Sequence, residues 1–271
     1  MFSDVLGHWA EKVISRMLRR NMIAGYEDGT FRPDKQITRA EVAAMLDKYY
    51  TAKWDLVKKL TPKVVTIIAK KGTANSLGSG VILDKQGHVA TNVHVIIAGI
   101  EPASDIKVYF DKAPDIGFPA QVKYGDFAQD IAILKVDGVP QSWLSPVIFA
   151  EEVNWLEDII CIGAPLGYKN TATMGIVSYE ERVISNTRWI QTDASINPGN
   201  SGGGAFNLYG ELVGLPTFKV IWADEAKTQP IDNMGFITPY DEIKKVYEYV
   251  LNKQKLGLHG EPVEFVIITQ G

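Results

Sequence analysis

Beyond Pro62 the sequence consists mainly of short runs rich in Val, Ile and Thr, and this pattern restricts the possible folds more than any other feature. Gly, Asn and Asp separate the runs, and these residues favour turns. Short strands at regular spacing are typical of an all-β barrel or sandwich. The runs are Val64–Ala69, Gly80–Leu83, Ile106–Phe110, Ile131–Val136, Ile159–Gly163, Gly175–Ser178, Glu211–Leu215 and Gly235–Thr238. Asp241–Leu251 follows with Ile243, Val246 and Val250 on one face, which predicts a closing amphipathic helix.

The first 50 residues differ, because their apolar residues recur at helical spacing. The residues at this spacing are Val13, Ile14, Met17 and Leu18, and then Val42, Ala43 and Leu46. The loop Gly25–Pro33 separates the two groups, and Thr38 with Glu41 forms a capping box that opens the second helix. We therefore expect a helix–loop–helix module at 1–50 and a linking helix at 51–62. The main domain is expected at 63–254 and a tail at 255–271.

Composition excludes several classes of protein. The chain has 271 residues, of which 46% are hydrophobic, and this is enough for a sizeable core. The net charge is −4 and the pI is about 5.6, so no basic face is implied and nucleic acid is not an expected partner. The single cysteine, Cys161, lies in an apolar run and is expected to be a buried, inert thiol.

The sequence contains no apolar stretch long enough to cross a membrane. The N-terminus does not have the pattern of a signal peptide. Two interpretations follow: the protein is intracellular, or an export signal has been removed from this chain.

The segment Asn197–Gly203 places one serine, Ser201, in a glycine-rich turn between two apolar runs. Such a turn can expose a hydroxyl group and direct backbone N–H groups towards the same point. A serine nucleophile with an oxyanion hole requires this arrangement. Taken alone, the segment is also compatible with an ordinary loop.

His94 is the histidine in the most suggestive setting, because it directly follows the strand-like stretch 89–93. A lone histidine in an apolar run is usually a core residue, so this signal is weak by itself. His8 and His259 are expected to be structural or exposed. His88 lies in a turn and is expected to be solvated.

Asp130 stands at the head of the apolar run 131–136, where it could be a turn residue, a cap or a buried acceptor. Asp126 is a competing carboxylate, but its glycine neighbour fits a turn better. His94, Asp130 and Ser201 occur in this order along the chain. The order is that of the chymotrypsin-type double barrel and differs from the orders in subtilisins and α/β-hydrolases. On that fold, the site would lie in the cleft between the barrels.

Residues 56–254 resemble the HtrA/Deg branch of the trypsin-like serine proteases. The matching segments are Gly78–Val81, Thr91–Ile96, Asp130–Val136, Gly163–Gly167, Gly175–Ser178 and Gln191–Gly203. The resemblance implies a mainly β, chymotrypsin-like double barrel of two six-stranded barrels, with their boundary near 140–156. It also implies endopeptidase activity on unfolded or exported proteins without a metal or cofactor.

The resemblance and the chemistry of serine attack together assign roles. His94 would be the general base, Asp130 would hold the imidazole tautomer, and Ser201 would be the nucleophile. The N–H groups of Gly199 and Ser201 would form the oxyanion hole, with Asn200 shaping the turn.

Substrate preference is expected from the residue six positions before the serine, which lines the primary specificity pocket in this fold. Here it is Ser195, which is uncharged, so we expect cleavage after Val, Ala or Leu. Leu215 and Pro216 are expected in the same pocket. Leu215-Pro216-Thr217 stands where relatives usually have Ile-Asn-Thr, and Pro216 has no N–H to pair with a substrate. Gly204 replaces a common proline, and no PDZ domain is recognisable.

The first region resembles one S-layer homology repeat. The segments that carry the resemblance are Phe2–Val5, His8–Ala10, Gly25–Pro33 and Ile37–Glu41. Repeats of this family usually act in sets of three and bind cell-wall polysaccharide, which would implicate Thr38 and Arg39. The expected location is then the cell surface or cell wall after export. A forked arginine side chain suits an anionic sugar substituent.

Two alternatives to a wall-attached protease stay open at this point. The chain could be a wall-binding protein whose barrel is a scaffold or a latent protease. The helical repeat could instead pack on the barrel or mediate self-association. In the tail, Glu264–Thr269 is strand-like but has no obvious partner after it.

Overall fold

The structure is a computed structural model that describes residues 2–19, 22–98, 101–164, 171–220, 232–255 and 264–266. The chain divides into two compact units, Met1–Lys59 and Leu60–Gly271. Within the described residues, no helix combines the length and the apolar character needed to cross a bilayer.

The first unit contains the predicted helix–loop–helix. The elements are η1 (Ser3–Val5), α1 (Glu11–Arg19) and α2 (Arg39–Leu60). Its buried core is small and consists of Val5, Ala10 and Ile14, with Phe2, Leu18, Ile23 and Phe31 packed against it. Because this core is small, large apolar side chains such as Trp9 and Leu46 stay exposed.

Helix α2 is continuous, which differs from the expected pair of separate helices. Residues 39–60 contain neither Gly nor Pro, so nothing interrupts the helix before Pro62. The capping box at its start is confirmed. Thr38 Oγ1 accepts a hydrogen bond from the Glu41 N–H at 3.1 Å, and the Glu41 carboxylate accepts one from the Thr38 N–H at 2.7 Å.

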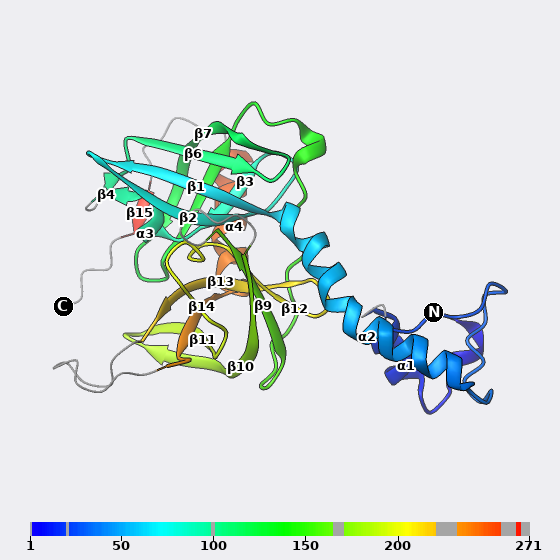
Figure 1. The fold of residues 1–271 in the computed structure, drawn as a ribbon. Coiled ribbons are helices and arrows are strands. Elements are labelled where there is room, and N and C mark those ends of the chain that lie inside the picture. Colours follow the sequence, from blue (N-terminus) through cyan, green and yellow to red (C-terminus); the bar gives the residue numbers. More distant parts are fainter. Residues whose placement is uncertain are drawn as a thin grey trace. The chain divides into compact units, whose positions relative to one another are not determined.

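The second unit contains two closed β-barrels, as predicted (Figure 1). The strands of barrel one, in order around the barrel, are β7 (Ala113–Asp126), β6 (Asp105–Phe110), β1 (Val64–Lys71), β2 (Ala74–Ile82), β3 (His88–Thr91) and β8 (Ile131–Val136). Strand β8 pairs back onto β7 and closes the ring. The strands of barrel two are β10 (Thr171–Ile184), β11 (Thr187–Thr192), β14 (Gly235–Pro239), β13 (Leu212–Lys219), β12 (Gly204–Asn207) and β9 (Asp158–Gly163).

Shorter elements complete the unit. They are η2 (Thr61–Lys63), α3 (Val93–Ile96), β4 (Ile97–Ala98), β5 (Glu101–Pro102), η3 (Gln141–Trp143) and β15 (Glu264–Val266). All the predicted strand runs lie largely within observed strands, whereas β7, β11 and β12 were not predicted. The predicted strand-like tail pairs in parallel with β7 over residues 264–266, so it does have a partner. Residues 267–269 of that prediction lie outside the described residues.

The C-terminal helix α4 (Tyr240–Lys255) joins the two barrels. It contacts β7 and β8 of barrel one and β13 and β14 of barrel two. The predicted apolar face is confirmed, because Ile243, Val246 and Val250 are all buried. Burial of this face stabilises the packing of one barrel on the other, and the cleft between them carries the candidate site.

Cys161 lies in β9 inside the core of barrel two, as predicted. It is fully buried, and this burial raises the pKa of its thiol to about 12. The thiolate form is therefore not populated at neutral pH, which agrees with an inert core residue.

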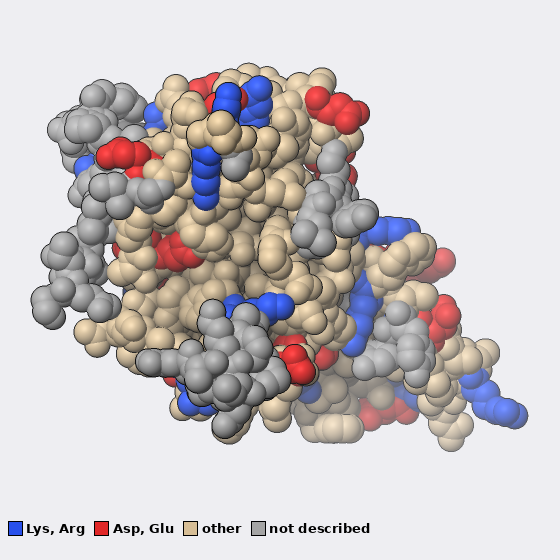
Figure 2. Space-filling view, turned by 60° about the vertical axis from the view of Figure 1, so that its left-hand side comes forward, with Lys and Arg blue, Asp and Glu red and all other residues tan. Residues whose placement is uncertain are grey.

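On the face of the molecule seen in Figure 2, Lys, Arg, Asp and Glu side chains are scattered among uncharged residues. Neither sign of charge gathers into a continuous patch on the described part of that face.

His88 is buried, so the prediction that it is solvated was wrong. It is 2% exposed and its Nδ1 lies 2.5 Å from Asp84 Oδ2. The hydroxyl group of Tyr247, on α4, donates to the same carboxylate oxygen at 2.6 Å. The helix therefore covers the β2–β3 turn, a long-range contact that the local turn pattern does not encode.

This carboxylate makes part of the stability dependent on pH. Burial alone would raise the pKa of Asp84, but the hydrogen bonds from His88 and Tyr247 outweigh it and lower the pKa to about 2. Because the folded value lies below the ordinary value of 3.8, the stabilisation is present above about pH 4 and is lost as the pH falls towards 2.

Asp84→Asn is expected to lower the free energy of unfolding by about 2 kcal/mol at neutral pH, because the amide cannot replace the charged acceptor. Urea unfolding of both proteins between about pH 2 and pH 7 measures the effect. The difference should disappear near the acid end of the range. A difference that stays constant down to that pH would contradict the assignment to Asp84.

Candidate active site

His94 and Asp130 meet at one end of barrel one. His94 lies in α3, directly after β3, and Asp130 directly precedes β8, which pairs with β3. His94 Nδ1 lies 2.5 Å from Asp130 Oδ2, and the His94 backbone N–H donates to Asp130 Oδ1 at 2.9 Å. The two carboxylate oxygens of Asp130 therefore contact the backbone N–H and Nδ1 of His94. Nε2, the other ring nitrogen, can hydrogen-bond to a different group.

The backbone of Asp130 is in the left-handed region, with φ of 53°. Aspartate tolerates this conformation better than most residues do. The buried Asn92 stabilises it, because Asn92 Nδ2 donates to the Asp130 carbonyl at 2.7 Å. Asn92 Nδ2 also lies 3.2 Å from Thr217 Oγ1, so it links the two barrels. Sequence reasoning missed Asn92, and its only signal was an amide in an apolar run.

Ser201 lies in the turn between β11 and β12 and is half-buried. Its hydroxyl group donates to the Thr217 carbonyl at 3.2 Å. Among the described residues, no hydrogen bond joins Ser201 to His94. Both residues nevertheless line one open cleft of about 300 Å³, together with Gly199, Thr217 and Lys219.

The nucleophile loop, defined here as Asn197–Gly203, leaves two N–H groups unused. Within the described residues, neither the Gly199 N–H nor the Ser201 N–H donates a hydrogen bond. The Asn200 N–H donates to the Asn197 carbonyl at 2.9 Å, so it is not available to a ligand. Gly199 has φ of 100°, a conformation that glycine adopts readily and other residues avoid. Of the expected oxyanion-hole residues, Gly199 and Ser201 therefore keep free donors.

Strand β13 borders the cleft through Thr217, Phe218 and Lys219. Leu215 and Pro216, which were predicted in the specificity pocket, are buried and do not line this cleft or the cavity beside Ser195. The Pro216 carbonyl accepts the Gly202 N–H at 3.0 Å, so it faces the nucleophile loop. A β-bulge between Pro216 and Phe218 turns the Thr217 carbonyl towards the cleft.

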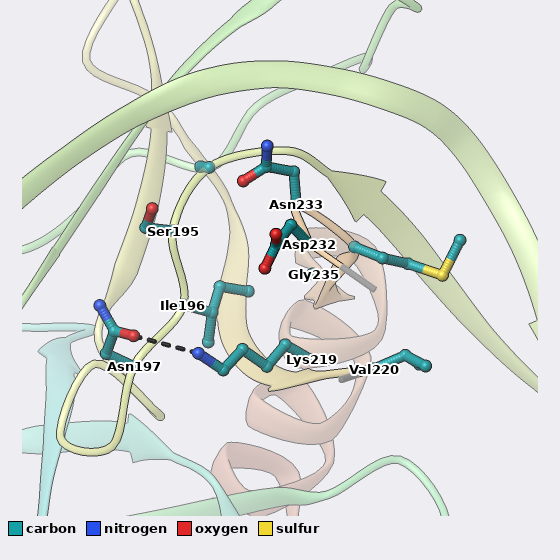
Figure 3. A pocket seen from close by; sticks show the side chains of 10 residues that line it. Ser195, Ile196, Asn197, Lys219, Val220, Asp232, Asn233 and Gly235 are labelled. Atoms are coloured by element: carbon teal, nitrogen blue, oxygen red, sulfur yellow. Dashed lines mark hydrogen bonds between the residues drawn. The ribbon is translucent and has the colours of Figure 1, made fainter. Parts of the chain in front are cut away.

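Ser195 lines a second cavity of about 150 Å³, which Figure 3 shows from close by. Asp232 extends into the same cavity, and Lys219 Nζ lies 3.2 Å from Asn197 Oδ1 at its wall. Ser195 was predicted to line the primary specificity pocket, whereas Lys219 and Asp232 were not predicted beside it. The cavity is therefore small, polar and lined by charges of both signs.

In the first unit, the two expected wall-binding residues lie at the start of α2. The Thr38 hydroxyl group and N–H both serve the capping box, as described above. Arg39 is exposed and makes no ion pair with any described residue. No cluster of three or more His, Cys, Asp or Glu side chains suited to a metal occurs among the described residues.

Comparison with known families gives two matches. Residues 78–215 match the trypsin-like peptidase domain, and residues 2–43 match the S-layer homology domain. The first match covers about half of the chain and includes His94, Asp130 and Ser201.

Individual proteins give the same result. The serine protease PepD of Mycobacterium tuberculosis is 34% identical, and the match covers 73% of this chain and 46% of that protein. The serine protease Do-like HtrA of Bacillus subtilis is 30% identical, and the match covers 74% of this chain and 49% of that protein. A crystal structure of the serine endoprotease from Yersinia pestis matches with a TM-score of 0.61 at 30% identity, and the match covers 73% of this chain and 66% of that one. The chain thus spans about half the length of the two curated relatives.

Proposed function

The chain belongs to the HtrA/Do-like trypsin-like peptidases and carries an S-layer homology module, and we propose that it is a serine endopeptidase acting on unfolded or exported proteins. One observation supports the proposal most strongly. His94, held by both oxygens of Asp130, faces the same cleft as Ser201.

The proposed reaction follows from the chemistry of these groups. Ser201 Oγ attacks the scissile carbonyl carbon, and His94 Nε2 accepts the hydroxyl proton. The same proton is donated to the leaving amine as the C–N bond breaks, which leaves an acyl group on Ser201. Water then attacks the acyl carbon by the same base catalysis and restores the serine. Asp130 keeps the proton on Nδ1 and stabilises the imidazolium that forms in each step.

The Ser201 hydroxyl group must turn towards His94 before it can react. In the structure it donates to the Thr217 carbonyl instead. Both residues border one cleft, and rotations about side-chain bonds are fast relative to turnover. The unused N–H groups of Gly199 and Ser201 would then stabilise the charge that develops on the substrate oxygen.

The wild-type protein is expected to hydrolyse casein at neutral pH and raised temperature, and a serine-directed fluorophosphonate should block the activity. Addition of a metal chelator should leave the activity unchanged. Complete absence of hydrolysis and of fluorophosphonate labelling would contradict the proposed activity and favour a wall-binding protein with a latent barrel.

Cleavage after small or medium apolar residues is the proposed specificity. The cavity beside Ser195 is small, and its opposite charges, Lys219 and Asp232, favour neither sign of substrate side chain by net charge. Profiling with a peptide library is expected to show cleavage mainly after Val, Ala or Leu. Asp232→Asn leaves the charge of Lys219 uncompensated, so cleavage after Val, Ala or Leu should persist and no cleavage after Lys or Arg should appear. Dominant cleavage after Lys or Arg that Asp232→Asn removes would assign the specificity to Asp232 instead.

The S-layer homology module supports a location at the cell surface, with cell-wall polysaccharide as the proposed partner. Arg39 is the proposed contact because its guanidinium is exposed and has no ion-pair partner among the described residues. Thr38 contributes by fixing the helix start on which Arg39 lies.

Arg39→Ala is expected to reduce binding to purified wall polysaccharide at least tenfold, through loss of a charge-assisted pair with an anionic substituent. A pull-down with the full chain measures the effect. The control is Arg16→Ala, which removes another exposed arginine of the same module. Equal binding by the wild type and Arg39→Ala would contradict the role of Arg39, and no binding by the wild type would contradict the partner.

A further inference from the structure

Ser79 has no role in the reaction described above, yet it makes two hydrogen bonds to the nucleophile loop from the other barrel. It lies in β2 of barrel one and is fully buried. Its hydroxyl group donates to the Gly199 carbonyl at 2.7 Å and accepts the Ala164 N–H at 2.9 Å. Its backbone N–H donates to the Ser201 carbonyl at 2.9 Å. One residue of barrel one thus binds the loop on both sides of Asn200.

These bonds fix peptide units next to the two free N–H donors. Gly199 is a glycine with φ of 100°, so few steric restraints hold the peptide that follows it. Ser79 Oγ holds the carbonyl of that peptide, while the Asn197 carbonyl accepts its N–H. The Asn200 side chain does not replace this restraint, because neither of its buried amide atoms has a hydrogen-bond partner among the described residues.

Close packing gives Ser79 little freedom to move away from the loop. A Cβ atom at Gly202 would lie 2.3 Å from the Ser79 carbonyl oxygen, so the loop approaches β2 as closely as a glycine permits. On the adjacent side, a Cβ atom at Gly78 would lie 2.5 Å from Val95, the neighbour of His94. The same short segment of β2 therefore contacts both the helix that carries His94 and the loop that carries Ser201.

We propose that Ser79 is a positioning residue that holds the Gly199–Ser201 turn in the conformation that presents both N–H donors to the substrate oxygen. It touches neither the substrate nor His94 and acts through the Gly199 carbonyl. The inference rests on the proposed peptidase activity. It adds that a residue of barrel one, Ser79, helps to stabilise the transition state by positioning the N–H donors of barrel two.

The test is Ser79→Ala in the full chain, assayed with a peptide substrate and a peptide boronate, which mimics the tetrahedral intermediate. Loss of one oxyanion donor typically costs about 10²–10³-fold in kcat, and an indirect effect should be smaller. We expect kcat to fall roughly tenfold to a hundredfold, with KM within about twofold of the wild type. Boronate affinity should fall by the same factor as kcat, because both depend on the donors.

Two further variants separate positioning from stability. Thr91→Val removes a different buried hydroxyl, which donates to the Ser79 carbonyl at 2.6 Å and not to the loop. It should lower the melting temperature while kcat stays within about threefold. Ser79→Cys keeps a donor at this position, although the thiol is larger and donates more weakly. Its kcat should fall between those of the wild type and Ser79→Ala, and it provides the result if the alanine variant does not fold.

Unchanged kcat and boronate affinity in a folded Ser79 variant would overturn the inference, as would equal losses in Thr91→Val. An inactive wild type would contradict the proposed function itself, so the two failures are distinguishable.

Discussion

Ser201→Ala is expected to lower kcat for casein and peptide hydrolysis by on the order of 10⁶-fold, with little change in the melting temperature. The hydroxyl group is the proposed nucleophile, so its removal eliminates the atom that would carry the acyl group. The hydrogen bond from this hydroxyl to the Thr217 carbonyl contributes little to stability, because Ser201 is only half-buried. Steady-state kinetics with a fluorogenic peptide, together with a thermal melt, measure both quantities.

The matched control for this variant is Ser142→Ala, which removes an exposed serine hydroxyl in η3, away from the cleft. It should have wild-type kinetics. If Ser201→Ala kept more than about one hundredth of the wild-type kcat, Ser201 would not be the nucleophile, because loss of a serine nucleophile costs far more.

Asp130→Asn is expected to lower kcat by about 10⁴-fold while the protein stays folded. The amide oxygen can still accept the His94 backbone N–H, which now bonds Oδ1 at 2.9 Å. The amide nitrogen would then face His94 Nδ1 in place of the oxygen that lies 2.5 Å away. Because two donors cannot pair, the imidazole proton would move to Nε2, and His94 could no longer accept the serine proton.

Asp126→Asn is the control for this second variant, because Asp126 was the competing carboxylate in the sequence. Asp126 Oδ1 accepts the N–H groups of Ala128 and Gln129, at 2.9 and 3.0 Å, so it stabilises a turn. We expect a small loss of stability and kcat within about threefold of the wild type. A larger loss of kcat in Asp126→Asn than in Asp130→Asn would reverse the assignment.

The fold could be predicted where the sequence pattern is local. The double barrel follows from apolar runs with turn residues between them, and the α4 face follows from the spacing of Ile243, Val246 and Val250. Strand β7 was missed because Pro114, Gly117 and Pro119 give it the composition of a loop. Pairing with β6 and β8 nevertheless holds these residues in a strand. Local propensity cannot predict this, because it does not include contacts between strands that are distant in the sequence.

The candidate site could be predicted only in part, because some of its contacts depend on residues that are distant in the sequence. His94, Asp130 and Ser201 gave weak signals one by one, and their order along the chain joined them. The position of Thr217 at the cleft was not predicted, because it lies at a bulge in β13 just after Leu215 and Pro216. A bulge adds a residue to one strand without a clear sequence signal. The interactions of Ser79 and Asn92 were not predicted, because each depends on the other barrel.

The most direct test of the central claim is to locate the adduct after the wild-type protein reacts with a fluorophosphonate at neutral pH. Intact mass should increase by one adduct per chain, and peptide mapping should place it on Ser201. The variants Ser201→Ala and His94→Ala should give no adduct under the same conditions, since the first lacks the nucleophile and the second lacks its base. An adduct on any other residue, or labelling that survives in Ser201→Ala, would contradict the assignment of Ser201 as the nucleophile activated by His94.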